Sequence, residues 1–599
     1  MFSQNNAEFS SELCESLGDI AKQSCQLYLK ASAFHNTWIF LNASGTISNI
    51  TEHFINTVAT YREFLETAST FLSHKATDKP IVLLAAGICA LLASSLILIY
   101  ILICLFKEIL IWRENLTGIK ENHYSLNLDE IFIMLCVFLH LFSLGGSSMV
   151  EEEQYTWHFF ASTLYLIFLY TNLRALLVAE NPDHSCKMKE GENTHHSFKN
   201  SARYNFDLSE NRVSLWTEIS RKYFKILCLL VVLICGRILR GWHQGGVNWS
   251  HLPDISTWLQ KSGVSYIKAF QIASMFLTII LSSFSLLVQS LTSLFLVGIL
   301  MGYFISGLLI LLYVFPTIMA SSYLDNSIHK IFYVILLIMV ITVLASPWFV
   351  SLSYKKTTWT AEFGLKSSVD FITQNVITLG IQNCSYLIGA VFTSSWCLLQ
   401  LLLQHPFNVM PMSLLLLQLY ASCAYFIIDG TFRKQWVEVA AMYFLGMAGH
   451  FSLGNSNSIA TVDVAGAFTG LSSHSMVLSG ILMFVITHAS SLLHSFGMIM
   501  PSSGPDNSEL IHNLAARLGF RCLIPLILNS ATLTSFTIIL LIMRDHLFVW
   551  SVFTPKYLYI CAATFSIYIG ILVIAATYLY VSSIVFFRIR MAGHGVRDS

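Results

Sequence analysis

The sequence predicts an all-α integral membrane protein, a polytopic helical bundle, and two observations support this. Of 599 residues, 55% are hydrophobic and only 11% are charged, whereas a soluble domain carries about a quarter charged residues because its surface faces water. The hydrophobic residues also gather in long continuous runs, and about 20 apolar residues cross the hydrocarbon core of a bilayer as a helix. These runs are too long for the short alternating strands of a β-barrel.

Hydropathy predicts about 13 transmembrane helices in a domain that covers residues 81–590. The spans are expected near residues 81–106, 131–149, 159–179, 223–240, 265–288, 291–315, 331–352, 376–403, 411–429, 437–453, 476–500, 521–543 and 557–587. Residues 1–80 form a polar segment with helical patterning over Leu13–Ala33 and Phe54–Leu72. Residues 181–222 are rich in polar residues and are predicted to form a flexible loop. Residues 591–599 form a short tail.

The Lys and Arg residues of the connections predict the orientation. One set of alternate connections holds 20 of them and the other set holds five. The positive-inside rule assigns the richer set to the cytosol, so we expect a lumenal N-terminus and a cytosolic C-terminus. Asn42, Asn49 and Asn248 lie in sequons on the expected lumenal side and are glycosylation candidates. Cys14 and Cys25 could pair in an oxidising lumen, although their spacing alone does not decide this.

Several functional classes are not favoured by the sequence. The formal net charge is zero, so charge gives no indication of a nucleic-acid partner. The sequence has no Walker A loop, nucleophile elbow, HExxH motif or zinc-type Cys/His spacing. Residues 1–80 contain no basic segment followed by an apolar run, so no cleavable signal peptide is expected. We therefore predict no catalytic residue, metal site or cofactor in this chain.

The first candidate site lies in Gly236–Gly246, at the expected lumenal end of the fourth span. Arg237 and Arg240 are three residues apart and share a helix face, and guanidinium groups suit phosphate by bidentate geometry. With Trp242 and His243 beside them, they predict a pocket for an anionic lipid head group. Alternatively, these are ordinary cations at a helix C-terminus, where the helix dipole favours them and their side chains reach water.

The second candidate site follows the tenth span and is expected on the same side. Small polar residues at this depth cannot face lipid without unmet hydrogen bonds, so they indicate a watery cavity or a polar ligand. An ordinary surface loop of turn-forming residues is the alternative. The candidates are His450, Asn455, Ser456, Asn457 and Asp463.

The stretches Gly236–Ile255 and His450–Asp463 resemble the membrane half of the type 2 GPI ethanolamine phosphate transferases. The resemblance covers roughly residues 80–590, and residues 1–80 resemble the segment that joins the two halves in that family. It implies a lumenal alkaline-phosphatase-like domain with two zinc ions and a threonine nucleophile. That domain moves phosphoethanolamine from phosphatidylethanolamine to the second mannose of a GPI intermediate. We expect this domain to be absent from the chain, so zinc and the catalytic residues are expected elsewhere.

The resemblance also implies a small hydrophobic stabilising subunit as partner and the endoplasmic reticulum membrane as location. The leading hypothesis is therefore a membrane domain that holds the GPI intermediate and phosphatidylethanolamine for the transfer. A transporter or lipid scramblase is one alternative, although Gly/Pro-broken repeated spans of the inverted-repeat kind are lacking. A catalytically inactive accessory subunit is the other.

Overall fold

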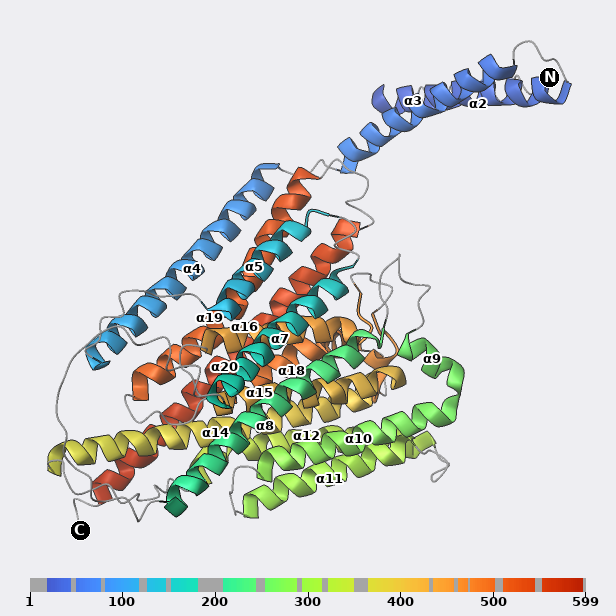
Figure 1. Cartoon of the computed structure of the whole chain (residues 1–599). Coiled ribbons are helices and arrows are strands. Elements are labelled where there is room, and N and C mark those ends of the chain that lie inside the picture. Colours follow the sequence, from blue (N-terminus) through green and yellow to red (C-terminus); the bar gives the residue numbers. More distant parts are fainter. Residues whose placement is uncertain are drawn as a thin grey trace. The chain divides into compact units, whose positions relative to one another are not determined.

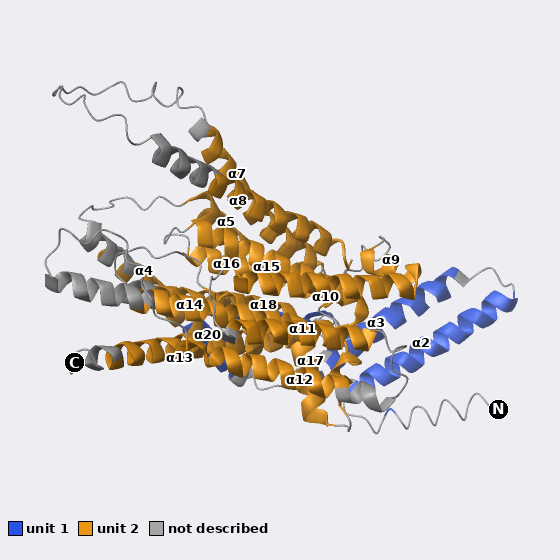
Figure 2. Cartoon of the chain, turned by 90° about the horizontal axis from the view of Figure 1, so that it is seen from below, with its two compact units in different colours: residues 1–93, 534–557 blue, residues 94–533, 558–599 orange. Residues whose placement is uncertain are grey.

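The computed structural model is all-helical over the residues that it describes, which confirms the predicted fold class (Figure 1). Contacts divide the chain into two compact units, residues 1–93 with 534–557 and residues 94–533 with 558–599 (Figure 2). The described residues are 14, 19–44, 50–76, 81–117, 127–146, 152–180, 208–243, 254–287, 294–314, 322–349, 365–429, 435–456, 462–471, 475–500, 510–543 and 552–595.

The first unit contains an antiparallel helical hairpin of α2 (Asp19–Ser44) and α3 (Ile50–Ala76). Ring contacts between Tyr28 and Phe64 and between Trp38 and Phe54 join the two helices along their length. A disulfide joins Cys14 to Cys25, which the spacing alone left open. The helical patterning predicted over Leu13–Ala33 and Phe54–Leu72 is confirmed where the chain is described, because α2 covers residues 19–33 and α3 covers residues 54–72.

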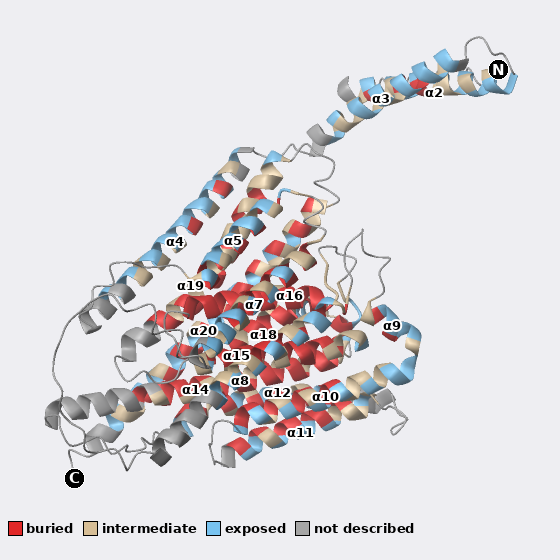
Figure 3. Ribbon diagram, viewed as in Figure 1, coloured by how far each residue is buried: buried red, intermediate tan, exposed pale blue. Residues whose placement is uncertain are grey.

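The second unit is the helical bundle, and its most buried helices are α14, α15, α16 and α18 (Figure 3). In α14, 78% of the apolar window Leu379–Leu403 is buried. The helices within this unit are α5 (Leu128–Ser143), α7 (Glu153–Glu180), α8 (Leu208–Arg240), α9 (Ile255–Ser262), α10 (Val264–Leu287), α11 (Leu294–Val314), α12 (Ser322–Leu344), α13 (Ser346–Phe349), α14 (Leu365–Leu403), η5 (Pro406–Asn408), α15 (Val409–Asp429), α16 (Gln435–Ser452), η8 (Gly466–Phe468), α17 (Met476–Thr487) and α18 (Ala489–Gly497). Three further helices contribute residues to both units: α4 (Ile81–Thr117), α19 (Leu510–Ile542) and α20 (Thr554–Gly595).

Eight of the described helices are long and apolar enough to cross a membrane, so the chain is a multi-pass membrane protein. A ninth span results if α17 and α18, bent by 68° at His488, are counted together. Every predicted span coincides with a helix, but α5, α8, α12 and α16 do not meet the same length and hydropathy criteria. The 16 residues of α5, for example, extend only about 24 Å at about 1.5 Å per residue. The total of 13 therefore stays a prediction.

The start of α8 differs from the sequence prediction. The helix begins at Leu208, so residues 208–222 are helical, whereas they were expected to belong to the flexible loop. Their charged and polar residues lower the hydropathy without preventing a helix, because Glu, Arg, Lys and Leu are good helix formers. Residues 181–207 lie outside the described part of the chain.

An ion pair joins α8 to α15 at the end of the bundle opposite Arg240. Lys225 Nζ lies 2.8 Å from Asp429 Oδ1, and the two side chains are only 17% and 12% exposed. We expect Asp429→Leu to lower the free energy of unfolding by about 1–3 kcal/mol, because it leaves a partly buried cation without its partner. The double variant Lys225→Met/Asp429→Leu should recover much of this loss. Thermal unfolding of the detergent-solubilised protein measures both, and additive losses would contradict a coupled pair.

Candidate functional site

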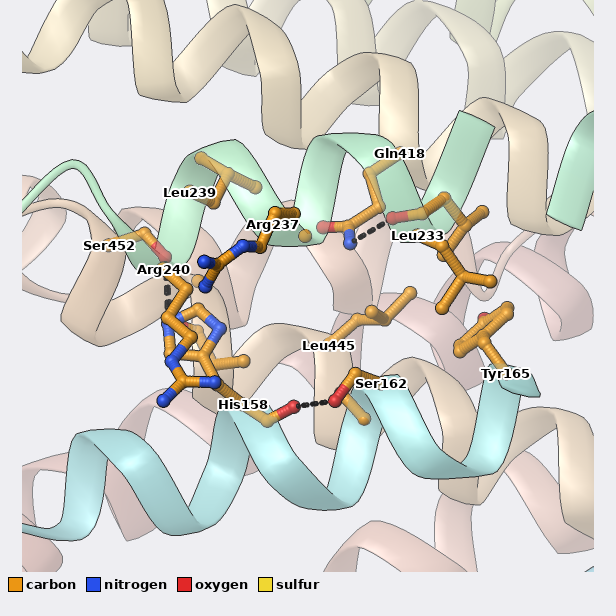
Figure 4. Close-up of a pocket in the computed structure, with 15 residues that line it drawn as sticks. His158, Ser162, Tyr165, Leu233, Arg237, Leu239, Arg240, Gln418, Leu445 and Ser452 are labelled. Atoms are coloured by element: carbon orange, nitrogen blue, oxygen red, sulfur yellow. Dashed lines mark hydrogen bonds between the residues drawn. The ribbon is translucent and has the colours of Figure 1, made fainter. Parts of the chain in front are cut away.

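A cavity of about 190 Å³ lies between α7, α8, α15 and α16, all in the second unit (Figure 4). We call it the Arg240 cavity. Its walls combine charged and hydroxyl-bearing side chains with aliphatic ones. The lining residues are His158, Ala161, Ser162, Tyr165, Val232, Leu233, Gly236, Arg237, Leu239, Arg240, Gln418, Leu445, Ala448, Gly449 and Ser452.

The two arginines predicted from the sequence both line this cavity. Arg237 and Arg240 are exposed residues in the last turn of α8, and Figure 4 shows their side chains extending from α8 toward α7. Within the described part of the chain, neither guanidinium forms an ion pair with a carboxylate. Arg240 lies over the ring of Tyr155, 5.7 Å from its centroid. Each guanidinium carries five N–H donors, so the pair offers an anion many donors.

The facing wall supplies further polar groups from α7 and α16. His158 and Ser162 are one helical turn apart on α7, and Ser162 Oγ donates to His158 O at 2.6 Å. His158 Nε2 lies 3.3 Å from Ser452 Oγ at the end of α16, and both of these side chains are buried. In Figure 4 these groups gather with Arg240 at one end of the cavity, whereas Leu233 and Tyr165 lie toward the other. The cavity is therefore amphipathic.

Two glycines allow the helices around the cavity to approach closely. A Cβ at Gly236 would lie 3.3 Å from Gln418 Nε2, the group that donates to Val232 O at 3.1 Å and joins α15 to α8. A Cβ at Gly449 would lie 2.7 Å from Leu415 Cδ2. A larger residue at Gly449 would displace its neighbours, because interiors pack at near-crystalline density, whereas at Gly236 the end of the Gln418 side chain would have to shift by a few tenths of an ångström.

Trp242 and His243 lie just beyond α8 and hold its end in place. Trp242 Nε1 donates to Phe407 O at 2.9 Å, and His243 Nε2 lies 2.7 Å from Asn408 Oδ1. Asn408 Nδ2 donates to Leu453 O at 2.7 Å, which orients the amide so that its oxygen faces His243 and His243 Nε2 carries the proton. Through η5, the end of α8 is thus joined to the end of α16.

The two sequence stretches singled out as candidate sites meet at His243. Gly454 has φ +82°, and a Cβ there would lie 3.2 Å from His243 Nε2. On the other side, Gln154 Nε2 donates to His243 O at 2.6 Å and joins the start of α7 to the same point. Neither Trp242 nor His243 lines the cavity, so their observed contacts position Arg237 and Arg240.

The environment of His243 predicts acid sensitivity. Burial lowers the pKa of His243 below its usual value of about 6.5, and the hydrogen bond to Asn408 offsets only part of this. The pKa of His243 is lower in the folded chain than in the unfolded chain. The contribution of the neutral, buried His243 ring to stability is therefore complete above about pH 6.5 and is lost as the pH falls through the folded-state pKa. His243→Gln should therefore show a smaller loss of thermal stability between pH 7 and pH 5 than the unsubstituted protein. An equal loss of thermal stability in the two proteins would show that His243 does not cause the acid sensitivity.

His450 and Asn455 lie near the end of α16 but outside the cavity. The buried ring of His450 stacks on that of His488, with centroids 6.0 Å apart. Asn455 Nδ2 donates to His450 O at 3.1 Å and to Thr487 O at 3.3 Å. These contacts fix the end of α16 against the bend between α17 and α18.

The remaining predicted residues have local roles or cannot be placed. Asp463 Oδ1 accepts from Gly466 N at 3.1 Å and stabilises the turn that leads into η8. Ser456 is partly buried after α16 and does not line the cavity. Outside the described residues lie Asn457 and the glycosylation candidates Asn49 and Asn248. Asn42 is exposed on α2.

Four polar lining residues were not predicted as site residues. His158, Ser162 and Gln418 are polar residues inside apolar helices, and an ionisable residue such as His158 in such a helix by itself marks a candidate functional position. Ser452 lies within the second candidate stretch but was not singled out. As a whole, the cavity offers donors and cations suited to holding a phosphate. The described residues contain no group of three or more His, Cys, Asp or Glu that could hold a metal ion.

The sequence profile described as the GPI ethanolamine phosphate transferase membrane region matches residues 208–584. This chain belongs to that family. The matched region runs from the start of α8 into α20 and includes both arginines of the cavity. No solved structure matches the chain.

Curated relatives of the chain are named GPI ethanolamine phosphate transferase 2. The human GPI ethanolamine phosphate transferase 2, catalytic subunit, is 26% identical over 503 residues, which is 80% of this chain and 46% of the human protein. GPI ethanolamine phosphate transferase 2 of Schizosaccharomyces pombe is 38% identical over 133 residues, 22% of this chain and 15% of that protein. The Aspergillus fumigatus protein of that name is 37% identical over 115 residues, 19% of this chain and 14% of its own length. The chain therefore spans about half or less of the length of these relatives.

Proposed function

We propose that this chain is the membrane region of a type 2 GPI ethanolamine phosphate transferase and acts in GPI-anchor biosynthesis. The observation that carries the proposal is that the family match contains α8, α15 and α16, three of the four walls of the Arg240 cavity. The helices hold the lipid-linked GPI intermediate and phosphatidylethanolamine. A zinc-dependent catalytic domain then transfers phosphoethanolamine to the second mannose, and a small hydrophobic subunit stabilises the assembly.

In this proposal the Arg240 cavity holds the phosphate of a membrane lipid. A single water molecule requires a cavity of at least roughly 10–15 Å³, so about 190 Å³ accommodates a phosphodiester and the first atoms of its substituents. Arg237 and Arg240 donate to the phosphate oxygens, and Leu233 and Leu445 face the apolar part of the lipid. Arginine suits this role because its fork matches two phosphate oxygens at once.

The proposal also gives the chain an orientation in the endoplasmic reticulum membrane. α7 begins, and α8 and α16 end, at the end of the bundle where the cavity lies. With a lumenal N-terminus and a cytosolic C-terminus, this end faces the lumen, where the second mannose of the intermediate would be modified. Asn42 would then be accessible to glycosylation.

Deleting the gene and analysing GPI glycans by mass spectrometry tests the function. We expect deletion cells to lack phosphoethanolamine on the second mannose and to regain it when the unsubstituted gene is restored. Unchanged GPI glycans in deletion cells would contradict the proposal. Glycans that lost phosphoethanolamine from a different mannose would contradict the assignment to the second one.

A further inference from the structure

The Arg240 cavity opens sideways, between α7 and α8. Its lining residues from α15 and α16 are all buried, whereas Ser162 on α7 and Arg237 and Arg240 on α8 are exposed. Figure 4 shows α7 and α8 on opposite sides of the cavity. The helices α15 and α16 therefore form its inner wall, and the opening lies between Ser162 on one side and the two arginines on the other.

An apolar stripe runs from this opening along the outer surface of α8. Ile234, Leu230 and Leu227 are exposed and lie three, seven and ten positions before Arg237. Residues at these spacings share one side of a helix. At about 1.5 Å per residue the stripe from Arg237 to Leu227 is about 15 Å long, which is half of the roughly 30 Å of hydrocarbon in a bilayer. The stripe thus has the depth of one leaflet.

A similar stripe follows the outer surface of α7 on the other side of the opening. Leu166 and Tyr170 are exposed and lie four and eight positions after Ser162, on the same side of the helix. Because α7 and α8 run in opposite directions, both stripes lead from the opening toward the same end of the bundle. We call the two stripes together the α7/α8 seam. Its residues are Leu166, Tyr170, Leu227, Leu230 and Ile234.

The size of the cavity requires that a bound lipid extend out of it. About 190 Å³ accommodates a phosphodiester and the first atoms of its substituents, but not the acyl chains of a membrane lipid. The chains of a lipid whose phosphate lies between Arg237 and Arg240 must therefore pass through an opening. The opening between α7 and α8 leads directly onto an apolar surface, where hydrocarbon chains can lie.

We propose that the α7/α8 seam binds the acyl chains of the lipid whose phosphate occupies the Arg240 cavity. The proposal rests on the proposed function, which takes the ligand of the cavity to be a membrane lipid, and it adds where the chains of that lipid lie. The lipid enters sideways from the surrounding leaflet. The guanidinium groups then match its charged part and the seam matches its hydrocarbon part.

Photo-crosslinking of lipids to the purified full-length chain in a neutral detergent tests the proposal. The probes are phosphatidylethanolamine and phosphatidylinositol, each with a diazirine in one acyl chain, used separately at a low ratio of lipid to protein. Peptide mass spectrometry then maps the labelled residues. We expect at least one probe to label the α7/α8 seam. Arg237→Ala/Arg240→Ala should lower this labelling at least about tenfold, because the phosphate loses its charge-assisted hydrogen bonds.

Two controls separate this effect from general lipid contact and from loss of charge. Ile338 and Ile341 are exposed on α12, and their labelling should be the same in all variants. Arg174→Ala/Arg221→Ala removes two exposed arginines of α7 and α8 that do not line the cavity, and it should leave labelling of the seam unchanged. Arg237→Lys/Arg240→Lys keeps both charges and should retain part of the labelling.

Four results would overturn the proposal. Labelling of the seam that persists in the double alanine variant would indicate ordinary contact with lipid. Arginine-dependent labelling of other helices alone would place the chains elsewhere, and an unlabelled seam with both probes would show that no chain lies there. Competition by glycerol 3-phosphate at the concentration of the probe would show that the chains contribute nothing to binding.

The proposed function is judged by a different measurement. Loss of phosphoethanolamine from the second mannose in deletion cells would uphold it even if the seam were not labelled.

Discussion

Replacing Arg237 and Arg240 together with alanine is expected to lower the chain's affinity for the phospholipid proposed to occupy the Arg240 cavity by roughly 100-fold or more. Each arginine contributes charge-assisted hydrogen bonds worth about 1.5–3 kcal/mol, and about 1.4 kcal/mol corresponds to a tenfold change in affinity. The same variant should fail to restore phosphoethanolamine on GPI in deletion cells. Because both side chains are exposed and form no ion pair with a described carboxylate, the fold should persist.

Size-exclusion chromatography and thermal unfolding establish that the double variant is folded, and lipid binding and GPI glycan analysis measure its function. Arg174→Ala/Arg221→Ala removes the same total charge from exposed positions of α7 and α8 and serves as the control. A double variant that restores GPI modification as well as the unsubstituted chain does would refute the assignment of these arginines. The same conclusion would follow if the control were equally inactive.

Ser162→Trp is expected to block the cavity without altering its charge. Ser162 is exposed on α7 and lines the cavity, so an indole there can cover the space next to Arg240 at little cost to folding. We expect lipid binding to fall at least about tenfold, because the ligand would have to displace a large apolar side chain. The measurement is phospholipid binding to the purified full-length chain by native mass spectrometry.

Ser162→Ala is the matched control for this steric effect. The hydroxyl of Ser162 donates mainly to His158 O within its own helix, so its removal should change lipid affinity less than about threefold. Similar losses in the Trp and Ala variants would indicate that the hydroxyl, and not the open space, is required. Full lipid binding by Ser162→Trp would show that the ligand does not enter the cavity at this wall.

The helical bundle could be predicted from the sequence because it depends on local properties. Long apolar runs must form helices in a bilayer, where every backbone group needs an internal partner. The pairing of Arg237 with Arg240 on one face follows from the helical repeat alone. Residues 208–222 were predicted as loop because hydropathy measures burial in lipid, and a polar helix outside lipid has no such signal.

The composition of the site could be predicted only in part because it depends on tertiary packing. His158 faces Arg240 only because α7 packs against α8. Trp242 and His243 were expected to contact a ligand, and in the structure their polar atoms bond to Phe407 and Asn408. A buried polar group needs a partner, but the sequence does not reveal whether that partner is a ligand or the short turn that precedes α15.

A cryo-electron microscopy structure of the full chain in phospholipid nanodiscs most directly tests the central claim, that the Arg240 cavity holds the phosphate of a membrane lipid. We predict phosphodiester density within hydrogen-bonding distance of both the Arg237 and the Arg240 guanidinium groups. A well-resolved cavity that contains only ordered water, with lipid phosphates at other sites on the chain, would contradict it.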